Sequence, residues 1–322
     1  MRLLFWQEEH PTVRGGAESW LRDTAAALRA RGHDVSWLQS NQIRLAVNNL
    51  KPDVVIMGTL HCFVGLEHVT WLAYQRTPAI WMLHDYWPFC SPRMLLRDHN
   101  RLSQGCEAVE GVCKNSCGGQ VDLAALVNRF YAVTGCEGAA TILRRNGINV
   151  RAVVEEGIDT DLFRPSGDER DATVVYASAA GDDAWKGIDV LRYTELPVRF
   201  LTGLSRAELA ATLGRAAVYA FPSVYQEIWG LTLTEAMACS CAVVASDVAG
   251  ARAQVEDGVT GLLVPAGDPA ALADALRRLL ADAALRARLG AAAREHVVAG
   301  HNLRALGERW EAVCMSVAGV TR

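Results

Sequence analysis

The chain has 322 residues, 51% hydrophobic and 21% charged, which is enough for two domains of ordinary size. Its 32 Lys and Arg residues against 36 Asp and Glu residues give a net charge of −4. This balance argues against nucleic acid as the main partner, because such surfaces carry a basic excess. No apolar run approaches a membrane span and the first residues lack the order of a signal peptide, so we expect a cytoplasmic protein.

The first ninety or so residues alternate strand-length apolar runs with amphipathic stretches. Strands are predicted at Leu3–Trp6, Asp34–Leu38, Val54–Met57 and Ala79–Leu83. Helices are predicted at Ala17–Arg31 and Val64–Gln75. This alternation is typical of parallel strands joined by crossover helices.

Residues 85–121 interrupt the alternation and contain four cysteines, Cys90, Cys106, Cys113 and Cys117. Four thiolates could form a closed tetrahedral zinc site that organises a loop with little apolar content of its own. An iron–sulfur cluster also uses four thiolates, and free thiols packed as small hydrophobic side chains are the plain alternative. The other five cysteines lie in apolar contexts, which indicates core positions.

A second α/β series follows a polar, turn-rich linker, and we place the boundary near residue 160. Its predicted strands are Val174–Ala177, Val198–Leu201, Val218–Phe221, Ala242–Ala245 and Leu262–Val264. Its predicted helices are Ala207–Leu213, Leu231–Cys239 and Ala270–Leu280. The tail is predicted to be helical from Ala283 to Val317, with a break at Gly300 and a new cap at Asn302.

The first candidate binding motif is Gly15-Gly16-Ala17-Glu18, between the first strand and the first helix. Adjacent glycines let backbone N–H groups approach an anion, and a helix N-terminus adds partial positive charge. A tight turn without a ligand is the alternative. The motif alone therefore indicates an anion site only weakly.

The second motif is Lys186-Gly187, after the first strand of the second series. An ammonium in this position can neutralise a phosphate, and the glycine permits the turn. A solvent-exposed lysine is the alternative. Since ligands bind at the carboxyl ends of strands in open α/β sheets, the position of this lysine favours a role in binding.

The third motif places Glu227 in a loop before a helix and Glu235 within that helix, eight residues later. A helical carboxylate can accept hydrogen bonds from a vicinal diol such as a ribose. The amides at the start of the helix could bind a phosphate; they belong to Ile228, Trp229, Gly230 and Leu231. In the plain alternative, Glu227 complements the helix dipole and Glu235 is solvated.

These motifs, in this order, resemble the family-four retaining glycosyltransferases of GT-B fold. The resemblance covers essentially the whole chain. In the C-terminal half it rests on Glu227 and Glu235, Ala236-Met237-Ala238, Val243-Val244-Ala245-Ser246 and Asp257-Gly258-Val259-Thr260-Gly261-Leu262-Leu263-Val264. In the N-terminal half it rests on Gly15-Gly16-Ala17-Glu18, Arg31-Gly32-His33-Asp34-Val35, His84-Asp85 and Gly157-Ile158-Asp159 before Phe163.

The resemblance implies a GT-B architecture with two Rossmann-like domains facing each other across a cleft. Residues 1–159 would form the acceptor-side domain with the cysteine-rich insertion 85–121. Residues 160–300 would bind the donor, and 301–322 would return to the N-terminal domain.

The resemblance also implies a retaining transfer from a nucleoside-diphosphate sugar, by a front-face mechanism that needs no metal. Glu235 would bind the ribose, and Glu227 and His84 would face the donor sugar. Lys186 with the amides after Glu227 would hold the diphosphate, approached by Gly16 from the other domain. We expect a small-molecule or lipid-linked acceptor and no nucleic acid.

The sequence departs from the family at one place. The family usually has a Gly-Arg pair near the diphosphate lysine, whereas residues 176–186 contain no arginine. Loss of such a cation removes a charge-assisted hydrogen bond of about 1.5–3 kcal/mol. A catalytically weak or inactive auxiliary protein of the same fold is therefore the alternative function. A GT-B sugar-nucleotide epimerase is a further rival that the paired glutamates disfavour.

The insertion follows His84 and is expected to overhang the acceptor side. Its Trp87, Phe89, Arg93 and Arg97 could contact an acceptor or make a weak contact with a membrane surface. Aromatic residues packing a small core of the loop itself are the alternative.

Overall fold

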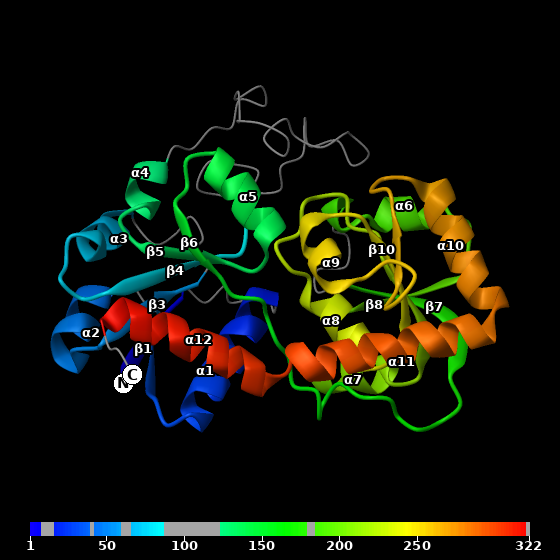
Figure 1. Cartoon of the computed structure of the whole chain (residues 1–322), viewed down its shortest axis with the longest axis horizontal. Helices are drawn as coiled ribbons and strands as arrows, with labels where there is room; N and C mark the ends of the chain where they lie inside the picture. Colours follow the sequence, from blue (N-terminus) through cyan, green and yellow to red (C-terminus); the bar gives the residue numbers. More distant parts are fainter. Residues whose placement is uncertain (8–15, 39–41, 59–65, 87–122, 179–183, 320–322) are drawn as a thin grey trace.

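The computed structural model describes residues 1–7, 16–38, 42–58, 66–86, 123–178 and 184–319. They form two α/β lobes that lie side by side, each built on its own sheet (Figure 1). The four cysteines proposed as metal ligands, and Gly15, lie outside the described residues.

The N-terminal lobe contains a six-stranded parallel sheet of order β2-β1-β3-β4-β5-β6. Its strands are β1 (Arg2–Trp6), β2 (Asp34–Leu38), β3 (Val54–Met57), β4 (Ala79–Leu83), β5 (Tyr131–Thr134) and β6 (Val150–Val153). Its helices are α1 (Gly16–Ala30), α2 (Ile43–Leu50), α3 (Leu66–Ala73), α4 (Ala124–Val127) and α5 (Glu137–Arg145). The central strands β3 and β4 are apolar runs that are buried along almost their whole length, as expected for a parallel sheet covered on both faces.

The C-terminal lobe contains a five-stranded parallel sheet of order β11-β10-β9-β7-β8. Its strands are β7 (Asp171–Ser178), β8 (Val198–Thr202), β9 (Ala216–Phe221), β10 (Ala242–Ser246) and β11 (Leu262–Val264). Its helices are α6 (Ile188–Arg192), α7 (Arg206–Leu213), α8 (Leu231–Ala238), α9 (Ala249–Gln254), α10 (Pro269–Ala281) and α11 (Ala283–Gly300). A short 3₁₀ helix, Ala184–Lys186, precedes α6.

Every strand predicted from the sequence is present. Four of the predictions, including Asp34–Leu38 and Leu262–Val264, have the observed bounds. The strands β5 and β6 and several short helices were not predicted individually. These elements either follow the irregular segment 85–121 or are too short to show a clear hydrophobic periodicity.

A single hydrophobic cluster runs through both lobes. It includes Phe5 and Ile80 of the N-terminal sheet and continues through Ile228 and Trp229 to Met237 of α8. A second cluster covers the other face of the C-terminal sheet, between β7, α6 and α10. The junction between the lobes is therefore partly a continuous apolar core.

The chain passes between the lobes twice, and the two crossing segments touch. The Ile158 N–H donates to the carbonyl oxygen of His301 at 2.9 Å. Asn302 then caps the last helix, α12 (Leu303–Ala318), because its side chain accepts from the N–H of Ala305. The predicted break and restart of the tail helix are thus confirmed.

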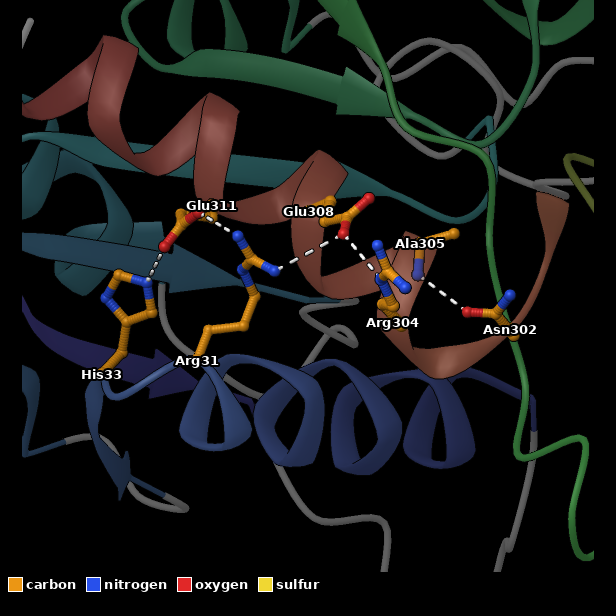
Figure 2. A network of polar contacts seen from close by, with 7 residues as sticks. All are labelled: Arg31, His33, Asn302, Arg304, Ala305, Glu308 and Glu311. Atoms are coloured by element: carbon orange, nitrogen blue, oxygen red, sulfur yellow. Dashed lines mark hydrogen bonds and ion pairs between the residues drawn. The ribbon is translucent and has the colours of Figure 1, made fainter. Parts of the chain in front are cut away.

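Helix α12 lies along α1 of the N-terminal lobe, although it follows the last element of the C-terminal lobe (Figure 1). Trp310 is fully buried against Trp20, with ring centroids 5.4 Å apart. Figure 2 shows polar contacts between α12 and the residues after α1: Glu311 accepts from Arg31 at 2.5 Å and lies 3.1 Å from His33 Nε2. An apolar layer and an ion-pair cluster therefore hold α12 on α1.

Four of the five cysteines predicted as core residues, Cys136, Cys239, Cys241 and Cys314, are buried free thiols. Burial raises the pKa of the Cys136 thiol to about 11, which keeps it protonated and unreactive at neutral pH. The fifth, Cys62, lies outside the described residues. Across the described parts of the chain, no helix combines the length and apolar character needed to cross a bilayer.

Candidate functional site

The structure brings Lys186 and Glu227 into direct contact. The Lys186 Nζ lies 2.6 Å from Glu227 Oε1, although the residues are 41 positions apart. The Lys186 side chain is 31% exposed, whereas that of Glu227 is 4% exposed. The lysine therefore reaches from a solvent-accessible position onto a buried carboxylate.

Two hydroxyl groups complete the surroundings of the Glu227 carboxylate. Tyr225 donates to Oε2 at 2.6 Å and Ser223 donates to Oε1 at 3.2 Å. A buried carboxylate is costly unless it is paired and hydrogen-bonded, and here one cation and two hydroxyls satisfy it. These contacts fix the orientation of the Glu227 carboxylate.

Two glycines shape the local backbone. Gly187 has φ +74°, and a Cβ there would lie 1.8 Å from the carbonyl oxygen of Pro222. Gly230 has φ +99°, and its Cβ would lie 2.6 Å from the ring of Phe221. Only glycine fits either position, so the Lys186 turn packs directly on the segment that leads to Glu227.

The N-termini of α1 and α8 meet at the junction between the lobes. A Cβ built on Gly16, the first residue of α1, would lie 3.8 Å from Leu231 Cδ1, in the first residue of α8. The first N–H groups of a helix have no partner within it, and the helix dipole adds positive potential there. Two such ends side by side form a suitable place for a diphosphate.

The side chains of Ile228 and Trp229 serve the packing of this junction. Both are 2% exposed, and a Cβ on Gly135 of the N-terminal lobe would lie 3.1 Å from Ile228 Cγ2. Trp229 Nε1 donates to Thr234 at 3.0 Å. Only the backbone amides of these two residues are therefore candidates for ligand contact.

Glu235 belongs to a second cluster of charges. Its side chain is 5% exposed and its Oε1 lies 4.0 Å from an Arg206 guanidinium nitrogen. Arg206 also donates two hydrogen bonds to Asp23 of α1, at 2.7 and 2.8 Å. Burial raises the pKa of the Glu235 carboxyl to about 8, while Arg206 lowers it and Asp23 raises it. The alternative of a solvated Glu235 is wrong.

His84 lies directly after β4, in the N-terminal lobe. Its Nδ1 lies 3.7 Å from Glu156 Oε1 and its ring packs edge-on against Trp20 at 4.5 Å. Its Nε2 is buried and has no hydrogen-bond partner among the described residues. One ring nitrogen is therefore available for a ligand.

The residues after His84 approach Glu227 from the opposite lobe. Burial raises the pKa of Tyr225 well above its usual value, and the charges of Glu227 and Asp85 raise it further. Burial likewise raises the pKa of Tyr86, with contributions from Cys136, Glu227 and Asp85. Both phenols stay protonated, and Tyr225 acts as a donor to Glu227.

The predicted site residues thus fall into two groups. The first group contains Lys186, Glu227 and the start of α8, with Gly16 beside them. The second group contains Glu235, one turn into α8, together with Arg206 and Asp23. Sequence reasoning missed Ser223, Tyr225, Arg206 and Asp23. The first two lie in the Glu227 motif, which was a signal, whereas Arg206 and Asp23 pair over 183 residues.

Within the described residues, no group of three or more His, Cys, Asp or Glu side chains is placed to hold a metal ion. Among the described residues, Lys186 contacts Glu227 and Arg206 contacts Asp23 and Glu235. Charge on a bound phosphate would be met here by the Lys186 ammonium and backbone N–H groups.

Comparison with solved structures defines the class of fold. HepE from Anabaena, solved with UDP and glucose, superposes with a TM-score of 0.72 over 98% of this chain and 100% of its own, at 18% identity. Sucrose-phosphate synthase from Thermosynechococcus elongatus gives a TM-score of 0.78 at 19% identity over 99% of both chains. The chain has the GT-B fold of these proteins.

The sequence comparison then matches part of the C-terminal lobe to a family. Residues 194–296, which include Glu227 and Glu235, are similar to the family described as "Glycosyl transferases group 1".

Two curated relatives match a limited part of the chain. A phosphatidyl-myo-inositol mannosyltransferase of Mycobacterium leprae is 48% identical over 100 residues, 31% of this chain and 27% of that protein. A D-inositol 3-phosphate glycosyltransferase of a Nocardioides species is 44% identical over 109 residues, 34% of this chain and 24% of that protein. The matched segment spans about a quarter of each relative.

Proposed function

We propose that this protein transfers a sugar from a nucleoside diphosphate to an acceptor hydroxyl, with retention at the anomeric carbon and without a metal. The observation that carries this proposal is the meeting of the N-termini of α1 and α8 beside the Lys186–Glu227 pair. Amides, helix dipoles and an ammonium there supply the charge that a diphosphate requires.

In this proposal Lys186 exchanges its partner when the donor binds. Without ligand its ammonium is neutralised by Glu227 at 2.6 Å. A diphosphate would take over the ammonium, and Glu227, still held by Tyr225 and Ser223, would accept hydrogen bonds from hydroxyls of the donor sugar. His84 would contact the sugar from the other lobe through its free Nε2.

The reaction breaks the bond between the anomeric carbon and the diphosphate oxygen, and forms a bond from the acceptor oxygen on the same face. The acceptor proton passes to the departing diphosphate oxygen. Catalysis then depends on positioning and on stabilising the negative charge that develops on the diphosphate. Glu235 would hold the ribose, and the acceptor, a small molecule or a lipid-linked one, would approach from the N-terminal lobe.

The test is release of free nucleotide during slow donor hydrolysis. Purified protein is incubated with a panel of UDP- and GDP-sugars, beside the variants Lys186→Ala and Glu227→Ala. We expect release with at least one donor and strong suppression in both variants. The matched control is Lys51→Ala, an exposed lysine that ends α2, which should behave as wild type.

The absence of arginine from residues 176–186 favours a second candidate, a protein that binds a nucleotide sugar without turnover. The same assay separates the two. Nucleotide binding without release from any donor, at any enzyme concentration, would support the auxiliary protein and contradict the transferase.

A further inference from the structure

A partly buried arginine, Arg206, joins the two lobes beside Glu235. Arg206 donates in parallel to both carboxylate oxygens of Asp23 in α1, at 2.7 and 2.8 Å. The nitrogen that binds Asp23 Oδ2 is also the one 4.0 Å from Glu235 Oε1. One cation of the C-terminal lobe therefore lies between a carboxylate of its own lobe and a carboxylate of the other.

The position of Arg206 is fixed by its own lobe. It is the first residue of α7, after a capping box in which Ser205 and Glu208 bind each other's backbone N–H groups. Its guanidinium also lies 5.4 Å from the centre of the Phe163 ring. Backbone and ring hold the side chain in the junction whether or not Asp23 binds it.

One nitrogen of the guanidinium, Nε, is buried and makes no hydrogen bond within the described residues. A buried donor without a partner costs about 1–3 kcal/mol. The arrangement is therefore incomplete as a purely structural ion pair and leaves the guanidinium able to serve a further acceptor.

We propose that Arg206 is a positioning residue that favours the ionised form of Glu235 and aims it at a ribose diol, and that Asp23 competes for the same guanidinium from the opposite lobe. This inference rests on the proposed function, because it assigns a task to the carboxylate that would hold the nucleotide. The ion pair between the lobes and the binding of the nucleotide then share one cation.

The other ionisable groups that face Glu235 do not supply this charge. Tyr219 of β9 and Cys239 at the end of α8 are buried, and burial raises the pKa of each, so both stay neutral. Arg294 of α11 donates to the carbonyl oxygens of Phe163 and Ala238, and Asp159 acts on Arg206. Arg206 and Asp23 are the charged groups that act directly on the Glu235 carboxyl.

The proposal predicts opposite effects of the two partners. Only the ionised carboxylate accepts hydrogen bonds from both ribose hydroxyls, so UDP affinity should rise with pH around the Glu235 pKa of about 8. Arg206→Gln should move this midpoint upward and weaken binding at pH 7 by about threefold to tenfold. Asp23→Asn should move it downward and strengthen binding at pH 7 by a similar factor.

The experiment is calorimetric titration with UDP, and with GDP in parallel, between pH 6 and pH 9.5. Arg206→Lys keeps the charge but not the planar fork, so we expect its midpoint to stay near that of wild type. The matched controls, Arg277→Gln and Asp274→Asn, remove an exposed pair on α10 and should leave the midpoint unchanged. Thermal unfolding shows that each variant is folded.

Shifts of Arg206→Gln and Asp23→Asn in the same direction, or no shift in either, would overturn the proposal and indicate a structural ion pair. If wild type binds neither nucleotide, the proposed function fails instead. The carboxyl ¹³C NMR titration of Glu235, assigned with Glu235→Gln and recorded without nucleotide, still tests the inference. It must show the same opposite shifts in the two variants.

Discussion

Helix α1 takes part in two ion-pair clusters that use the same chemistry in different surroundings. Directly after its C-terminal end, Arg31 pairs with Glu311 and Glu308 of α12, whose side chains are 12% and 47% exposed. In its middle, Asp23 pairs with Arg206, and the Asp23 side chain is 9% exposed. The two arginines are exposed to a similar extent, 26% and 24%, so the clusters differ mainly in their neighbours: Arg206 also faces the buried Glu235 of the candidate site.

The reason is the surroundings of the carboxylates. The Arg31 cluster includes the half-exposed Glu308, so water partly screens its charges. Around Arg206 the two carboxylates, Asp23 and Glu235, are only 9% and 5% exposed, so a change in one charge alters the ionisation of the next. We therefore expect variants of the first cluster to change stability slightly, and variants of the second to change ligand binding and its pH dependence.

The largest effect on stability is expected at the packing of Trp310 of α12 against Trp20 of α1. Trp310→Ala should lower the free energy of unfolding by about 3–5 kcal/mol, because a fully buried tryptophan leaves a cavity. Urea denaturation measures this loss. Trp71→Ala, at a partly exposed tryptophan on α3, is the control and should cost clearly less. Equal losses in the two variants would show that packing on α1 does not hold α12.

The next effect concerns His301, where the chain returns toward α1. Burial, with the nearby His296, lowers the pKa of His301 to about 4. Between about pH 6.5 and pH 4 the unfolded state therefore binds more protons at His301 than the folded state does. The contribution of neutral His301 to the free energy of unfolding is complete above this range and is lost as the pH falls through it. The loss amounts to about 3 kcal/mol.

Urea denaturation at pH 7 and pH 4 tests this contribution. The free energy of unfolding should fall by about 3 kcal/mol more in wild type than in His301→Gln. The two proteins share all their carboxyl groups, so acid titration of those groups cancels. Parallel losses would mean that His301 is not held neutral in the folded protein.

A comparable effect is expected on nucleotide binding. Lys186→Met should weaken UDP binding by about 1.5–3 kcal/mol, the contribution of a charge-assisted hydrogen bond. Because this variant leaves Glu227 buried without its cation, Lys186→Met with Glu227→Gln separates loss of binding from loss of folding. Isothermal calorimetry measures the affinity, with Lys51→Met as the control. Unchanged affinity in the single variant would remove Lys186 from the site.

The smallest effect on stability is expected at the ion pairs of Arg31 with Glu311 and Glu308. Arg31→Gln should cost at most about 1 kcal/mol, and less at high salt, because the pair is partly screened. Thermal unfolding at low and high ionic strength measures the difference. If the free energy of unfolding falls by more than about 2 kcal/mol and the loss does not change with salt, the proposed difference between the two clusters is wrong.

Much of the fold could be predicted because parallel strands buried on both faces are continuous apolar runs. Val54–Met57 and Ala79–Leu83 are such runs, bounded by polar or turn residues, and both have the predicted bounds. Tyr131–Thr134 is nearly as buried, but it begins and ends with a residue that carries a hydroxyl group and it follows an aperiodic segment. The alternation of strands and helices that supports the other predictions is interrupted before it.

The site residues likewise divide into those with a local signal in the sequence and those without one. Lys186, Glu227 and Glu235 were found because each stands in a local motif at the end of a strand or the start of a helix. Arg206 looks like an ordinary surface residue in sequence, and its partner Asp23 lies in the first helix. Only the packing of the lobes brings them together, so no local pattern could reveal the pair.

The most direct test of the central claim is a crystal structure of the protein with UDP. The account predicts ribose hydroxyls within hydrogen-bond distance of the Glu235 carboxylate, and a diphosphate between Lys186 and the N-termini of α1 and α8. A nucleotide bound away from these groups, or no nucleotide at millimolar UDP, would contradict it.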